Sequence, residues 1–535
     1  MAFMVAFLAV AVAILAASLL LLSRRRTHLP PGPRGFPLLG NLLQMRSVLG
    51  SPMNLQNLAR QHGAIMTLRV GSVPLVVISS SQLAHEALIE KGSIFSSRPS
   101  LSERQVRLSN DRRSINAAPY GHHWRTVRRN MVSHVLSPHR VHAFEPARQR
   151  VISELVEKLR QTSQRADSPD GPSYRTVDKE YSADSPVYRV DKECRADSTS
   201  CSAVPVLATL RFTVFSLLSY MCFGQWLDKD AVNGVERMLR HLITSAGRGG
   251  RMSDFVPLLK IVQRSPRDLK LEELVGERRE LLLPLIQRAK LLAAEDKLDQ
   301  NSYLSSLFSL QRQEDHQLKL TDEDLIVLCS EFLNAGADTT ANTLEWSLAN
   351  VIKHPAVQKK LLEEIHSSVG DKPVTEKDID KLVYLKAVVK ETLRKHPPGY
   401  TTLPHAVTEP CKLGGYDIPV HATLLFNIYA INNDPELWTN PDEYKPERFL
   451  EGPGASADFT ASSGVLNLIP FGAGRRICPG LGLATLHVHL VLARLVQEFE
   501  WNTVPGDTAV DLTPIQEFTV VMKQPLRATL KARRL

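Results

Sequence analysis

The sequence predicts a large helical protein that follows an N-terminal membrane helix. Three stretches carry this prediction: an uncharged apolar run over Met1–Leu22, a long apolar segment between Thr321 and Pro355, and the periodic segment LGLATLHVHLVLARLVQEF after Pro479. The 535 residues are 43% hydrophobic and 23% charged, which is enough apolar material for a sizeable core. We therefore expect one large globular unit behind the anchor.

The first element is the apolar run over residues 1–23, which Arg24-Arg25-Arg26 follows directly. About 20 apolar residues cross a bilayer as a helix. A cleaved signal peptide is the alternative, but this run is longer than a typical signal core and its charges lie on the far side. The positive-inside rule keeps the arginines in the cytosol. We expect a single-pass anchor with the globular part facing the cytosol.

A basic, Pro/Gly-rich hinge over residues 24–41 comes next. The stretch LPPGPRGFPLLGN holds four prolines and three glycines in thirteen residues, so it cannot be helical. It is either a stiff connector between anchor and body or an ordinary loop. The catalytic domain is expected over residues 42–535.

A short, imperfect repeat interrupts that domain. The chain reads ADSPDGPSYRTVDKE from Ala166, ADSPVYRVDKE from Ala183 and ADSTS from Ala196. The repeat is polar and cannot bury enough apolar surface to offset its ordering entropy. We expect a disordered surface insertion over residues 164–202, with a docking motif as the alternative.

The segment from Thr321 to Pro355 predicts one long buried helix. Thr321 and Asp324 look like a capping box, and the helix should end before His354-Pro355. Its centre, Ala335-Gly336-Ala337-Asp338-Thr339-Thr340, sets small residues beside an acid and two hydroxyls. One interpretation is a close helix crossing with threonines bonded to the preceding turn. The other is a notch for a ligand, with an acid–alcohol pair that handles protons.

Charge and cysteine content narrow the function classes. The net charge of +9 is mild for this length, so it is weak evidence for nucleic acid and fits an anionic membrane or an acidic partner at least as well. The six cysteines include no CxxC pair, which argues against a zinc ribbon or a disulfide framework.

The decisive motif is FGAGRRICPG near the C-terminus. Glycines around Cys478 let the backbone approach a flat ligand, and Pro479 suits the start of the helix that follows. A thiolate binds metal, and a nearby helix start stabilises it. Arg476 is placed to neutralise an acidic group. The motif therefore predicts a sulfur ligand offered at a helix start.

This motif resembles the haem-binding signature of the cytochrome P450 family of haem-thiolate monooxygenases. The five matching positions are Phe471, Gly474, Arg476, Cys478 and Gly480. The resemblance implies the family's fold, mainly α with a smaller β portion and one large haem domain. It also implies haem b as cofactor, with Cys478 as the axial ligand of its iron.

Further matches follow in the family's order. The resemblance implies a buried structural cluster of Glu391, Arg394 and Arg448 behind the haem. It implies that Trp124, Arg128 and His405 meet the haem propionates. It also makes the long helix the one over the distal haem face, which favours the notch interpretation: Ala335 and Gly336 would lie beside the haem, and Asp338 and Thr339 would relay protons.

The resemblance also implies partners. Two electrons must come from elsewhere, and the sequence has no evident flavin or nicotinamide fingerprint. The anchor implies NADPH–cytochrome reductase as the donor, at the endoplasmic reticulum membrane. Arg125, Arg128 and Arg129 would form part of a basic docking surface, or those not bound to haem would simply face solvent.

The substrate rests on resemblance alone. The segments INAAPYGHHWRTVRRNMV, GGYDIPV, ATLHVHL and QEFTVVMKQPLRA are similar to a plant subfamily of in-chain fatty-acid hydroxylases and epoxidases that act on lipophilic cutin precursors. The alternatives are a fatty-acid hydroperoxide isomerase or dehydratase of the same fold and a membrane haem sensor or carrier. Neither alternative has a use for the pair Asp338–Thr339.

Overall fold

The fold is that of a computed structural model, which describes most of the chain after the predicted anchor. The described residues are 12, 28–36, 39–71, 73–166, 203–247, 266–312, 319–420, 422–460, 464, 466–507 and 509–533. The predicted anchor, apart from Val12, and the repeat from residue 167 to 202 lie outside them.

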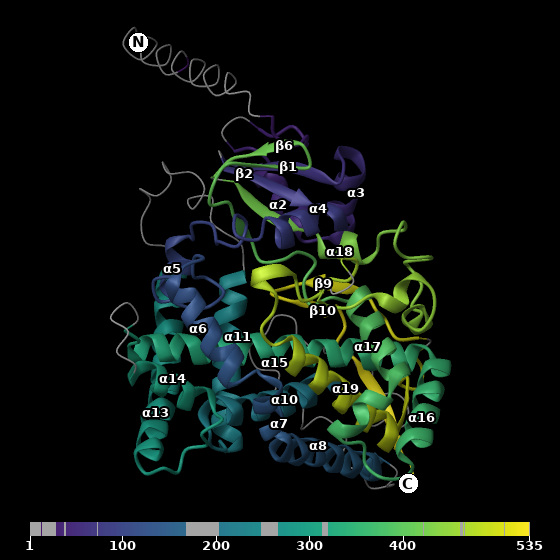
Figure 1. The fold of residues 1–535 in the computed structure, drawn as a ribbon. Helices are drawn as coiled ribbons and strands as arrows, with labels where there is room; N and C mark the ends of the chain where they lie inside the picture. Colours follow the sequence, from purple (N-terminus) through teal and green to yellow (C-terminus); the bar gives the residue numbers. More distant parts are fainter. Residues whose placement is uncertain are drawn as a thin grey trace.

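Helices form most of the described chain (Figure 1). Before the repeat these are α2 (Leu42–Leu49), α3 (Pro52–His62), α4 (Ser81–His85), the π-turn η1 (Glu86–Glu90), α5 (Glu103–Leu108), α6 (His122–His134), α7 (Pro138–Ala143) and α8 (Glu145–Ala166). After it come α10 (Val206–Phe223), α11 (Lys229–Gly247), α13 (Pro266–Ala294), α14 (Tyr303–Arg312), α15 (Asp322–Lys353), α16 (Pro355–Val369), η5 (Glu376–Lys381), α17 (Val383–Lys395), α18 (Ile428–Asn432), η6 (Pro446–Phe449), η7 (Pro453–Ser456), η8 (Gly474–Arg476) and α19 (Leu481–Glu498).

The β portion is small and lies mainly at the end of the molecule nearest the N-terminus (Figure 1). A four-stranded sheet has the order β1 (Ile65–Val70), β2 (Val73–Ile78), β7 (Thr423–Phe426), β4 (His405–Ala406), in which only the β2–β7 pair is parallel. The described residues also form a sheet of β3 (Val204–Pro205), β11 (Arg527–Ala532) and β8 (Phe499–Asn502), and the pairs β5 (Cys411–Leu413) with β6 (Tyr416–Ile418) and β9 (Pro514–Gln516) with β10 (Val520–Met522).

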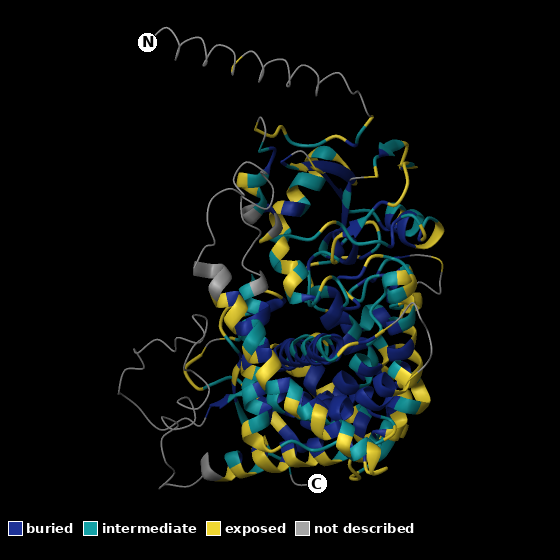
Figure 2. Ribbon diagram, turned by 90° about the vertical axis from the view of Figure 1, so that its left-hand side faces the viewer, coloured by how far each residue is buried: buried dark blue, intermediate teal, exposed yellow. Residues whose placement is uncertain are grey.

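The long helix α15 runs through the middle of the helical part (Figure 1). It starts with the predicted capping box, because the Asp324 amide donates to the Thr321 hydroxyl and the Thr321 amide donates to Asp324. It ends at Lys353, before His354-Pro355, as predicted. It packs against α10, α17 and α19, and buried residues gather between these helices while exposed ones lie outside (Figure 2).

The hinge segment is attached to the sheet. The Thr67 amide of β1 donates to the Pro31 carbonyl (2.8 Å), and the Asn41 amide donates to the Arg69 carbonyl (2.6 Å). A Cβ at Gly32 would overlap the Thr67 carbonyl, so this close approach requires glycine. The non-helical prediction is confirmed for the described part, which is a docked loop.

Among the described residues, α10 is the one helix long and apolar enough to cross a membrane. It is mostly buried inside the protein, where it packs against α15, so it is a core helix.

Candidate active site: a cysteine loop, a notched helix and buried arginines

The cysteine loop is fixed by two left-handed glycines. Gly472 and Gly474 have φ values of +69° and +67°. A Cβ at Gly474 would overlap the carbonyl oxygen of Leu88 in η1, so the glycine there serves a contact between protein backbones. The Cys478 amide donates to the Phe471 carbonyl (2.9 Å), which closes the loop just before α19 begins.

Opposing influences act on the pKa of the Cys478 thiol. Burial raises the pKa of the Cys478 thiol, whereas the amide of Gly480, which donates to the sulfur, and the guanidinium of Arg128 act to lower that pKa. Metal binding requires the thiolate, and a metal cation would itself stabilise it. The loop therefore presents a sulfur ligand that a bound metal cation would stabilise as the thiolate.

The middle of α15 is open on one face. Ala335 is exposed and Thr339 is half-buried, although Leu325–Ser330 and Thr340–Ile352 of the same helix are buried. The Thr339 hydroxyl donates to the Ala335 carbonyl (2.7 Å), so its oxygen keeps room for another donor. A Cβ at Gly336 would contact Leu218 of α10 at 2.8 Å. Gly336 thus serves the close helix crossing, while Ala335 and Thr339 face open space.

Asp338 is paired with an arginine from α10. Its Oδ1 lies 3.2 Å from Nε of Arg211, and Nη2 of Arg211 lies 3.4 Å from the Asn342 amide oxygen. The Asn342 side chain in turn donates to Thr519 (2.8 Å). Sequence reasoning missed Arg211, although a single arginine within the apolar segment VLATLRFTVFSLLSYMCF was a usable signal.

Three half-buried arginines lie near the cysteine loop without a carboxylate in contact; we call Arg98, Arg128 and Arg476 the arginine set. Within the described part of the chain, the hydrogen bonds that their guanidinium groups donate go to backbone carbonyls. Arg476 donates to Ser96, Ile115 and Ala118 (2.7, 3.0 and 2.6 Å), Arg98 to Asn116, Leu403 and Pro404 (2.8, 3.3 and 2.8 Å), and Arg128 to Ile477. Burial, and then mutual repulsion, lowers the pKa of Arg476 to about 9. Burial lowers the pKa of Arg98 to about 10.

Trp124 and His405 lie in the same region. The indole Nε1 of Trp124 is buried and has no hydrogen-bond partner among the described residues, while Arg476 lies over its ring at 4.4 Å. The His405 Nδ1 bonds to the Phe95 carbonyl (2.7 Å), and burial together with the neighbouring Arg98 lowers the pKa of His405 to about 3. Excess positive charge and an unused indole donor fit a ligand that carries carboxylates.

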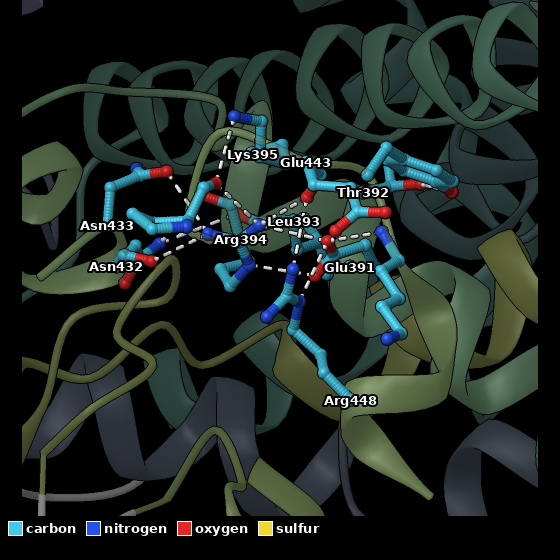
Figure 3. Close-up of polar contacts among 12 residues, drawn as sticks. Glu391, Thr392, Leu393, Arg394, Lys395, Asn432, Asn433, Glu443 and Arg448 are labelled. Atoms are coloured by element: carbon cyan, nitrogen blue, oxygen red, sulfur yellow. Dashed lines mark hydrogen bonds and ion pairs between the residues drawn. The ribbon is translucent and has the colours of Figure 1, made fainter. Parts of the chain in front are cut away.

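The cluster of Glu391, Arg394 and Arg448 is a buried ion-pair network (Figure 3). Glu391 accepts from Nε of Arg394 (2.7 Å) and from Nε of Arg448 (3.1 Å). Glu391 also accepts from Nη2 of Arg394 (2.9 Å) and from the Lys445 amide (2.8 Å). The remaining guanidinium N–H groups reach carbonyls and one amide of the 432–443 segment. The network joins α17 to the segment that leads to η6.

Comparison with known proteins decides the family. The profile described as Cytochrome P450 matches residues 30–175 and 182–532. The chain belongs to the cytochrome P450 family. It is 34% identical over 523 residues to Cytochrome P450 89A9 of Arabidopsis thaliana, with 95% of this chain and 94% of the relative covered. It is also similar to an isoflavone 2'-hydroxylase of Glycyrrhiza echinata (31%; 96% and 93% covered) and to the flavonoid 3',5'-hydroxylase CYP75B138 of Crocosmia x crocosmiiflora (33%; 93% and 89%).

As a cytochrome P450, the chain is a haem-thiolate monooxygenase that receives electrons from a redox partner. The residues present fit haem. Cys478 offers the sulfur, the arginine set and the Trp124 indole offer partners for the two haem carboxylates, and α15 presents an open face at Ala335 and Thr339. Sequence reasoning missed Arg98, because nothing in the local sequence FSSRPS distinguishes it from a surface arginine.

Proposed function

We propose that this cytochrome P450 is an NADPH- and O2-dependent enzyme of the endoplasmic reticulum membrane that hydroxylates or epoxidises fatty acids within the chain. The observation that carries the oxygen-inserting reaction is Thr339 on the open face of α15 beside Asp338, a pair for which an isomerase or a haem sensor has no use. The fatty-acid substrate is supported by the resemblance of four sequence segments.

The chain's own residues hold the cofactor and move protons. Cys478 would bind the haem iron, and bound haem supplies the oxygen-activating chemistry. Thr339 presents a hydroxyl oxygen toward the open face of α15. Asp338 precedes Thr339 and is paired with Arg211. Its carboxylate would leave Arg211 and turn toward Thr339, and so carry protons from the protein side to the hydroxyl.

Two exposed apolar side chains support a lipophilic substrate. Leu403 is 51% exposed and Phe518 is 46% exposed. Each is next to the site: the Leu403 carbonyl accepts from Arg98, and Thr519, beside Phe518, bonds to Asn342 of α15. Apolar groups so placed favour an apolar chain over a charged substrate.

The reductase is proposed to dock on α6. Arg125 and Arg129 are exposed on this helix, while Arg128 turns inward to the Ile477 carbonyl. Neighbouring positions of one helix would thus serve the partner and the haem.

The test is product analysis after expression with a reductase in microsomes. A panel of fatty acids, fatty-acid hydroperoxides, an isoflavone and a flavonoid is incubated with and without NADPH, and products are identified by mass spectrometry. We expect NADPH-dependent in-chain products from fatty acids. The matched variant Cys478→Ser should lose both the thiolate-type carbon monoxide spectrum and all product.

Other outcomes assign other functions. Conversion of hydroperoxides without NADPH would assign the isomerase or dehydratase reaction. Oxidation of the flavonoid but of no fatty acid would assign a flavonoid as the substrate class. Thr339→Ala should divert electrons to hydrogen peroxide while binding substrate normally. Unchanged coupling of NADPH use to product in that variant would remove Thr339 from the relay.

A further inference from the structure

Glu331 is an acid on the open face of α15 that the reaction does not use. It lies four residues before Ala335 and eight before Thr339, so the three share one helix face. Its carboxylate accepts two backbone N–H groups, from Ile115 and Asn116, at 2.7 Å each. Two helical turns earlier, Asp324 accepts from Asn110 and Arg113 at 2.8 and 2.6 Å. Two carboxylates thus hold residues 110–118, which we call the strap.

The opposite edge of the strap contacts two members of the arginine set, Arg98 and Arg476. The Ile115 and Ala118 carbonyls accept from Arg476, and the Asn116 carbonyl accepts from Arg98. The peptide N–H groups of residues 115 and 116 therefore face a carboxylate, while carbonyls of the same segment face guanidinium groups. Hydrogen bonds in such a chain polarise and strengthen one another. The strap connects α15 to the cysteine loop through the peptide unit that joins Ile115 to Asn116, whose N–H donates to Glu331 and whose carbonyl accepts from Arg476.

The strap does not hold this shape through its own preferences. Asn110, Asp111 and Arg112 have φ values of 47°, 53° and 64°, which are left-handed conformations in three consecutive residues with side chains. Each costs on the order of 1 kcal/mol for an L-residue, less for asparagine and aspartate. The strap needs anchors from outside, and Glu331 and Asp324 supply them.

Glu331 also balances local charge. Arg98 and Arg476 act to lower the pKa of Glu331, whereas burial, the larger influence, raises that pKa to about 7. Neither arginine touches the carboxylate, so Glu331 acts on them through the strap.

We propose that Glu331 is a positioning residue for haem binding. Its carboxylate fixes the strap, and the strap carbonyls aim the guanidinium groups of Arg98 and Arg476 at the haem carboxylates. The proposal requires haem but not the fatty-acid substrate or the proton relay, so it stands or falls separately from the proposed function.

The test measures haem loss from the ferric holoprotein to excess apomyoglobin. Glu331→Gln keeps the shape and removes the charge, and Glu331→Asp keeps the charge but shortens the reach. We expect haem loss at least about tenfold faster in Glu331→Gln, equivalent to about 1.4 kcal/mol, with Glu331→Asp between it and the wild type. Asp322→Asn, on the same helix and paired with Lys290, is the control and should not change the rate.

Two further readouts separate positioning from general destabilisation. In a double-mutant cycle with Arg476→Lys, the effects on haem loss should be less than additive, because both act through Ile115. The amides of Ile115 and Asn116 should exchange hydrogen slowly in the wild-type holoprotein and at least about tenfold faster in Glu331→Gln, which weakens both hydrogen bonds. Full additivity, fast exchange at residues 115 and 116 in the wild type, or unchanged haem loss in Glu331→Gln would each overturn the proposal.

Discussion

Two groups of arginines inside this protein, one buried and one half-buried, differ in how their charge is balanced. In the Glu391 cluster, Arg394 and Arg448 each contact the carboxylate directly, at 2.7 and 3.1 Å. In the arginine set, the hydrogen bonds of the guanidinium groups go to carbonyls, and no carboxylate among the described residues touches them. The first group has its counter-charge within the chain, whereas we propose that the second receives it from the haem carboxylates.

The difference shows that hydrogen-bond satisfaction and charge balance are separate requirements. A carbonyl satisfies an N–H but carries no counter-charge. Burial first, and then repulsion from neighbouring arginines, lowers the pKa values of Arg98 and Arg476, although Glu331 acts to raise them. A buried cation with bonds but no counter-charge is therefore a sign of an anionic ligand, while a buried ion pair is a sign of structure.

The largest effect is expected in the balanced cluster. Glu391→Gln leaves two guanidinium groups buried without their carboxylate, which should destabilise the protein by about 3–5 kcal/mol. We expect little folded holoprotein, measured by the carbon monoxide spectrum and thermal unfolding. Glu443→Gln, whose exposed side chain lies beside the cluster, should behave as wild type. Normal yield and stability of Glu391→Gln would show that the cluster is dispensable.

A smaller effect, of mixed sign, is expected in the arginine set. Arg476→Met removes a cation that has no counter-charge in the chain, so the haem-free protein should unfold at a higher temperature, while the holoprotein should lose haem on the order of a hundredfold faster. Arg394→Met, the matched change in the other cluster, should destabilise both forms. If Arg476→Met lowered the thermal midpoint of the haem-free protein, the two groups would not differ as described.

The smallest effect is expected at Glu345, a buried acid that belongs to neither arginine group. Burial raises the pKa of Glu345 to about 7, although the Leu526 amide and Arg211 oppose this. The folded state therefore holds a proton that the unfolded state releases near pH 4.5, and stability falls as pH rises through this window. Glu345→Gln should lack this fall, so its stability relative to wild type should grow by about 1 kcal/mol between pH 6 and pH 8. A pH-independent difference in thermal midpoint would contradict the assignment.

Local patterns predicted the parts of this molecule that depend on local chemistry. The capping box at Thr321 and the His354-Pro355 stop fixed both ends of α15, and FGAGRRICPG predicted the loop before α19. The signature also drew attention to Arg476. Arg98 and Glu331 escaped prediction because their roles arise from the tertiary path of the strap, which brings residues 115 and 116 to a helix more than 200 positions away.

The central notch shows the same division. Helix composition alone left a helix crossing and a ligand notch as alternatives for residues 335–340, and the family resemblance favoured the notch. The structure shows a close crossing and an open face at adjacent residues. Gly336 faces α10 and Ala335 faces open space. Helical geometry places neighbouring residues about 100° apart, so one short segment can serve both purposes.

Gly474 has a consequence for how this loop tolerates change. A methyl group there would collide with the Leu88 backbone rather than with a movable side chain, and its φ of +67° already disfavours every other residue. Saturation mutagenesis of position 474 should therefore recover only glycine. Position 472 has a similar φ but open space around it, so it should tolerate asparagine. The substitutions that this loop tolerates are therefore limited by its contact with η1 as much as by metal binding.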